Sequence, residues 1–85
     1  MARYQILYWR GIPAQVKAWD DIDEVKREMP PRFTARIDRE AQALGLTMTD
    51  DYLAQWRWGE ELDREGEVQD VVDIIIHELE TSYPQ

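Results

Sequence analysis

The sequence contains no cysteine, and this absence removes several chemistries at the outset. Without thiols the chain can form neither a disulfide framework nor a thiolate metal site. Its one serine, Ser82, lies near the C-terminal end, where nothing places it for nucleophilic catalysis. The four glycines are scattered and form no phosphate-binding loop. The residues therefore give no positive support to an enzyme, and they indicate no cofactor, metal or catalytic residue.

Long apolar runs and a surplus of basic residues are also missing. The most apolar window, residues 71–76, is interrupted by Asp73 and is far too short to span a bilayer. The N-terminus shows no run suited to a signal peptide. The net charge of −8 disfavours nucleic acid and anionic membranes, because both attract a basic surface. We expect a cytoplasmic protein that binds neither nucleic acid nor membrane.

The apolar and aromatic content is sufficient for one small domain. The 85 residues are 44% hydrophobic and include four tryptophans and four tyrosines. This composition argues against disorder, and the length allows a single core. We expect residues 1–85 to form one domain.

Alternating side chains predict an N-terminal β-hairpin. Residues 3–10 are rich in aromatic and branched side chains on both faces, as in a well-covered strand. Residues 11–13, Gly-Ile-Pro, predict a turn, and residues 14–19 alternate as a second, antiparallel strand. Residues 25–29 fit a helical turn or a third strand. The two prolines that follow favour the extended form.

Two longer patterns predict helices. From Pro31 to Leu44, apolar residues form one stripe, and Gly45 is a natural C-cap. From Gly66 to about Tyr83, valines and isoleucines follow the 3.6-residue period.

The aromatic segment at residues 52–62 fits either a strand or a helix capped by Thr49. We favour a strand from about Leu53 to Leu62, with a possible helical turn before it. The predicted fold class is therefore α+β: a two-layer sandwich whose small, mostly antiparallel sheet, made of the hairpin and a later strand, carries two helices on one face.

Aromatic and arginine side chains are the strongest functional signal. Because two helices cover only one sheet face well, at least one aromatic side chain should lie on the open face. Trp and Arg dominate the energetics of binding surfaces, although part of this set must pack the core. The candidate binding residues are Trp9, Arg10, Pro13, Gln15, Arg32, Asp38, Tyr52 and Trp56.

Other polar clusters have ordinary explanations beside the functional ones. His77 is the only histidine, and it fits a solvated helix position better than a metal ligand or general base. The three arginines at positions 32, 36 and 39 fit a salt-bridged helix face, or alternatively an anion-binding groove shared with Arg10. The acidic runs are typical of solvated turns.

Three segments resemble a known family, the small bacterial "virulence factor" domain. They are "YWRGIPAQV", "PPRFTARID" and "DDYLAQWR". The matching positions are Trp9, Arg10, Ile12, Pro13, Ala14, Gln15 and Val16, then Arg32, Phe33, Ile37 and Asp38, then Tyr52, Leu53 and Trp56. Met29 stands where the family pattern has leucine, and Arg36 stands where it has alanine.

The resemblance implies an accessory role and no catalytic residues. It implies that some members of the family are larger proteins, in which this domain accompanies an iron–sulfur-scaffold-like domain and helical repeats. It also implies stand-alone members near folate- and corrinoid-dependent methyl-transfer proteins. Lacking cysteine, this chain cannot itself hold an iron–sulfur cluster through thiolates.

Two functional hypotheses arise, with a third that is weaker. The first is a non-enzymatic protein-interaction module beside such cofactor-handling machinery. Its partner would dock around Trp9, Arg10, Pro13, Gln15 and Trp56. The second is an anion-binding protein or small enzyme that uses Arg10 and Arg32, with Asp38 or His77 as the acid–base group. The third is a homodimer that seals the open face. A concave site should gather polar groups from separate segments, whereas a docking surface should expose Trp and Arg.

Overall fold

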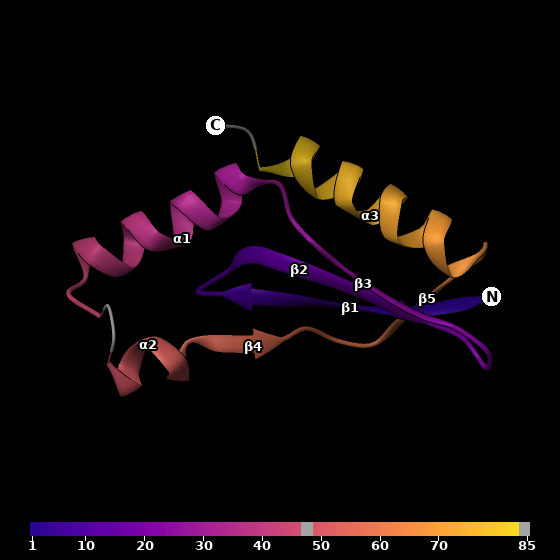
Figure 1. The fold of residues 1–85 in the computed structure, drawn as a ribbon, viewed down its shortest axis with the longest axis horizontal. Coiled ribbons are helices and arrows are strands. Elements are labelled where there is room, and N and C mark those ends of the chain that lie inside the picture. Colours follow the sequence, from indigo (N-terminus) through magenta and orange to yellow (C-terminus); the bar gives the residue numbers. More distant parts are fainter. Residues whose placement is uncertain (47–48, 84–85) are drawn as a thin grey trace.

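The computed structural model describes residues 1–46 and 49–83, which form the predicted α+β sandwich (Figure 1). In chain order the elements are β1 (Ala2–Trp9), β2 (Ile12–Trp19), β3 (Glu24–Glu28), α1 (Pro31–Ala43), α2 (Asp50–Ala54), β4 (Trp56–Trp58), β5 (Leu62–Arg64) and α3 (Val68–Ser82). The helices α1 and α3 follow one another along one long side of the molecule, and α2 lies across the hairpin end from α1 (Figure 1). The extended form predicted for residues 25–29 and both longer helices are confirmed.

The sheet is antiparallel and is built around β1. On one side β1 pairs with β2, which in turn pairs with β3. On the other side β1 pairs with β4 near its end and with β5 near its beginning. Between these two short strands the N–H of Gly59 donates to the Ile6 carbonyl at 2.8 Å. The second edge of the sheet is thus one strand line with an interruption at Gly59.

The hairpin turn is shorter than predicted. Trp9 pairs with Ile12, so only Arg10 and Gly11 lie between the strands. Their φ angles are 48° and 83°, and two positive values define a type I′ turn, whose twist suits a hairpin. The prediction that residues 11–13 form the turn is wrong, because a two-residue loop keeps Ile12 and Pro13 within β2.

A bulge in β2 changes which way its first residues face. Leu7 pairs with Gln15, but Tyr8 pairs with Pro13, so Ala14 is the extra residue. Because side chains alternate, the extra residue places Ile12 on the same face as Gln15. The alternation predicted for residues 14–19 holds only beyond this point.

The core lies between the sheet and the helices. Its buried residues include Trp9, Ile12, Val16 and Ala18 from the sheet, Phe33, Ile37 and Ala41 from α1, and Val68, Val71, Val72 and Ile75 from α3. The predicted α1 stripe is buried except for Leu44, which follows the last helical residue and is 46% exposed.

The segment at residues 50–64 differs most from its prediction. The Thr49 hydroxyl accepts from the Tyr52 N–H at 3.2 Å, and Asp50 and Asp51 occupy the first turn of α2. A capping oxygen and carboxylates at a helix N-terminus both stabilise a helix, and they outweigh the aromatic alternation that favoured a strand. The strand predicted over residues 53–62 is wrong in its first part, and the later part of the segment forms the two short strands β4 and β5.

Charged side chains attach α3 to the sheet. Arg64 of β5 donates to both carboxylate oxygens of Glu78, at 3.0 and 2.7 Å. These bonds hold the pKa of Glu78 below its usual value. Arg27 of β3 forms an ion pair with Asp73. No helix within residues 1–46 or 49–83 combines the length and the apolar character that a membrane crossing demands.

We expect Arg10→Asn to stabilise the domain. Arg10 is exposed and holds a left-handed backbone that asparagine adopts more readily, so relief of this strain should raise the free energy of unfolding by about 0.5–1 kcal/mol. Thermal denaturation checks this. Arg10→Ala is the matched control, because it removes the side chain and keeps the strain. Equal melting temperatures for the two variants would contradict the prediction.

Candidate functional site

One face of the sheet carries an aromatic and cationic surface, which we call the open face. It comprises Gln5, Leu7, Lys17, Trp19 and Trp58, which share a face through the register of β1, β2 and β4. The opposite face holds the fully buried Val16 and Ala18, against which α3 packs. Trp58 is 43% exposed, which confirms that at least one aromatic side chain lies on the uncovered side.

A lysine lies between two tryptophans on the open face. The ammonium of Lys17 is 5.1 Å from the ring centroid of Trp19 and 4.8 Å from that of Trp58. Both distances are within the range of a cation–π interaction. This contact joins β2 to β4 across β1 and keeps both indole rings at the surface.

A pocket of about 220 Å³ opens beside this face at the hairpin end. Side chains from six elements line this pocket, which we call the Gln15 pocket. Its apolar lining is Leu7, Ala14 and Ile37, its aromatic walls are Tyr52 and Trp56, and its polar groups are Gln15, Glu28, Thr34 and Asp38. Separate segments thus bring polar groups into one concavity, as a binding pocket requires.

The aromatic walls are held from behind by Trp9. Its ring is fully buried and lies 5.5 Å from the Tyr52 ring, and its Nε1 donates to the Tyr52 carbonyl at 3.0 Å. Tyr52 in turn meets Trp56 edge to face, with centroids 6.1 Å apart. These contacts position α2 and β4 against the end of the sheet.

The structure divides the predicted binding residues into groups. Gln15, Asp38, Tyr52 and Trp56 come together in the pocket. Trp9 and Pro13 are fully buried. The ring of Trp9 packs against Tyr52 of α2, and Pro13 pairs with Tyr8, on the face of the sheet opposite to Trp9.

The two predicted anion-binding arginines are engaged separately. Arg10 donates to Gln55 at 3.4 Å, beside the turn. Arg32 donates to the carbonyls of Tyr83 and Glu80 at 2.6 and 2.9 Å, and so caps the C-terminal end of α3. Neither arginine lines any of the three hollows described in this section. The carboxylates of the Gln15 pocket also disfavour an anion there.

The lone histidine occupies an exposed position on α3. The main-chain carbonyl of His77 accepts from Thr81 Oγ1 at 3.0 Å. Within residues 1–46 and 49–83, no group of three or more His, Asp or Glu side chains is arranged to hold a metal ion.

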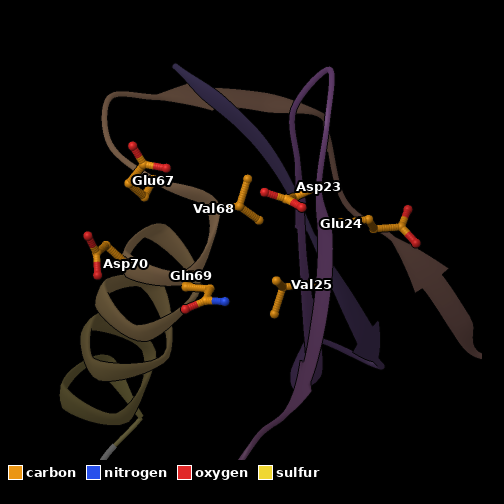
Figure 2. Close-up of a pocket in the computed structure, with 7 residues that line it drawn as sticks. All are labelled: Asp23, Glu24, Val25, Glu67, Val68, Gln69 and Asp70. Atoms are coloured by element: carbon orange, nitrogen blue, oxygen red, sulfur yellow. The ribbon is translucent and has the colours of Figure 1, made fainter.

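A larger hollow of about 440 Å³ lies between β3 and the start of α3 (Figure 2). Asp23 and Gln69 point into it, whereas Glu24 and Asp70 point away (Figure 2). The diverging carboxylates do not converge on one ligand position.

Another hollow, of about 470 Å³, lies beside Trp19. Three of its polar groups are already used: Arg3 pairs with Asp63, and the Asp20 carboxylate accepts from two backbone N–H groups, which lowers its pKa. These two hollows are weaker candidates than the Gln15 pocket.

The list of candidate binding residues from sequence omitted several residues of these surfaces, namely Leu7, Lys17, Trp19, Glu28 and Trp58. The alternation of β2 placed Lys17 and Trp19 on the same side as Gln15, and that signal was present in the sequence. The positions of Glu28 and Trp58 depend on which strands flank β1 and β2, and single-strand patterns do not contain this information.

The fold and site define a small open-faced α+β domain with a side-chain-sized pocket at one end of its sheet. The family model described as "Virulence factor" matches residues 7–85, and the chain belongs to this family. The resemblance noted in the sequence is thereby confirmed. No solved structure matches the chain significantly.

The chain is similar to a segment of longer staphylococcal proteins named "Conserved virulence factor C". It is 28% identical over 81 residues to the protein of Staphylococcus aureus strain USA300, and 27% identical to that of strain NCTC 8325. Each match covers 95% of this chain and 20% of the relative. The chain therefore spans about a fifth of the length of these curated relatives.

We expect Trp9 and Trp58 to differ sharply in their effect on folding. Trp9→Ala should cost about 3–5 kcal/mol of unfolding free energy, because it empties a fully buried site behind Tyr52. Trp58→Ala should cost less than about 1 kcal/mol, because that ring is partly exposed. Urea denaturation measures both. Similar losses would show that Trp58 is a core residue.

We expect Arg32→Ala to lower the free energy of unfolding by about 1–2 kcal/mol. The variant leaves two carbonyls of α3 without their charged donor and removes the guanidinium from the Phe33 ring, 4.2 Å away. The exposed Arg36→Ala on the same helix is the control and should change stability by less than about 0.5 kcal/mol. Full rescue by Arg32→Lys would contradict the capping role, because an ammonium cannot reproduce the fork.

Proposed function

We propose that this protein is a non-enzymatic interaction module that docks on another protein through its open face. The observation that carries the proposal is the Lys17 contact with Trp19 and Trp58, which keeps two indole rings on an uncovered sheet surface. Tryptophan is enriched among the residues that dominate binding energy.

The proposed partner is a protein portion equivalent to the other four fifths of the staphylococcal relatives. In those proteins the segment similar to this chain occupies 20% of the length, so the remainder shares its polypeptide. An exposed aromatic surface on this segment is suited to contact that remainder, whether it belongs to the same chain or to another. The link to iron–sulfur or corrinoid and folate methyl-transfer machinery rests on the sequence resemblance alone.

The alternative of an anion-binding protein or enzyme has less support. Arg10 and Arg32 donate to different acceptors in separate parts of the molecule. Asp38 lies in a pocket with a second carboxylate, Glu28. These positions do not combine into the acid–base and anion site that the alternative needs.

Site-specific photo-crosslinking in native cells tests the docking surface. A benzophenone side chain replacing Trp58 should crosslink to one protein that resembles the remainder of the relatives. The same probe at Ile74 is the matched control, because Ile74 is 42% exposed and lies on α3. With that partner purified, Trp58→Ala should weaken binding by about tenfold.

Three results would reject the proposal. The first is equal crosslinking from positions 58 and 74. The second is capture of a second copy of this chain, which would support the homodimer. The third is binding that Trp58→Ala leaves unchanged while the variant stays folded.

A further inference from the structure

The Gln15 pocket has a size that excludes most ligands. Pockets for small molecules and cofactors typically measure about 300–1,000 Å³, and this one is about 220 Å³. It is therefore large enough for a single side chain and too small to enclose a cofactor. Its position next to Leu7, which also belongs to the open face, makes it continuous with the proposed docking surface.

Two of the polar groups of the pocket are carboxylates, which are negatively charged hydrogen-bond acceptors. Glu28 comes from β3 and Asp38 from α1, and the two carboxylates meet at the same concavity. Within residues 1–46 and 49–83, no ion pair or side-chain hydrogen bond engages either carboxylate or the amide of Gln15. A positive group that reaches this position finds acceptors not used by the protein.

The aromatic walls of the pocket favour a flat cationic ligand. Tyr52 and Trp56 are partly buried and are held in place by Trp9. A flat cation can stack on such rings while it donates to carboxylates. Guanidinium does both, because it is planar, weakly hydrated and carries a fork of N–H donors that matches carboxylate oxygens.

We propose that the Gln15 pocket receives an arginine side chain of the docked partner. The guanidinium donates to Glu28 and Asp38 and stacks against Trp56, and the methylene stem lies on the apolar lining of Leu7 and Ile37. The net charge of −8 attracts basic segments toward this surface during encounter. This inference rests on the proposed docking function and specifies one residue of the partner.

Nuclear magnetic resonance titration of the isotope-labelled protein tests the occupant directly. The probe is Nα-acetyl-arginine amide, and the reporters are the Trp56 indole N–H and the Gln15 side-chain amide. Both signals should shift and saturate, while the Trp19 indole, which lies beside another hollow, should not. Nα-acetyl-citrulline amide has nearly the same shape without the charge, and it should bind at least about tenfold more weakly.

Paired variants separate the carboxylates from general acidity. Glu28→Gln and Asp38→Asn should each weaken arginine binding by about threefold, as expected for exposed charges. Glu40→Gln removes an exposed carboxylate of α1 that does not line the pocket, and it should leave binding unchanged. Equal binding of citrulline would overturn the charge recognition. Equal binding of Nα-acetyl-lysine amide would overturn the choice of guanidinium.

The outcomes distinguish this inference from the docking proposal. A partner captured from position 58, combined with no arginine-induced shift at Trp56, would reject the arginine and leave the docking surface intact. Arginine binding in the pocket, combined with no position-specific partner, would reject the docking surface and show a pocket that takes free arginine.

Discussion

The contact between Trp9 and Tyr52 holds the pocket end of the domain together. A helix as short as α2, with five residues, is not stable by itself in water. Its attachment to the sheet runs through Tyr52, whose ring packs on Trp9 and whose carbonyl accepts the indole N–H. Because Tyr52 then packs on Trp56, one buried side chain fixes both aromatic walls of the pocket.

The fold was largely predictable from the sequence where the hydrophobic pattern of a helix extends over several helical turns. The α1 and α3 patterns were long enough to overcome local exceptions, and both helices were located correctly. Short segments were harder, because a few contacts decide them. Gly11 and Pro13 have strong turn preferences, yet the pairing of Trp9 with Ile12 places the turn at Arg10 and Gly11, against the intrinsic preference of arginine. The start of α2 depends on one side-chain hydrogen bond, in which the Thr49 hydroxyl accepts from the Tyr52 N–H.

The candidate site was predictable only in its residue types. Gln15 and Asp38 stood out in sequence, but their meeting depends on α1 reaching the end of β2. The role of Arg32 was inaccessible for a different reason. Its acceptors are main-chain carbonyls of α3, and any residue at positions 80 and 83 supplies them. Sequence patterns reveal side-chain partners far better than backbone partners.

Both edges of the sheet are poorly suited to pairing with another strand. On β3, charged residues such as Lys26 and Arg27 occupy the edge, and such charges oppose strand addition. On the other side, β4 and β5 have three residues each and are separated at Gly59. Strand addition is therefore disfavoured at both edges, and the docking proposed above would use the side chains of the open face. Because specificity then rests on side-chain identity, a few substitutions on this face can change the partner without altering the fold.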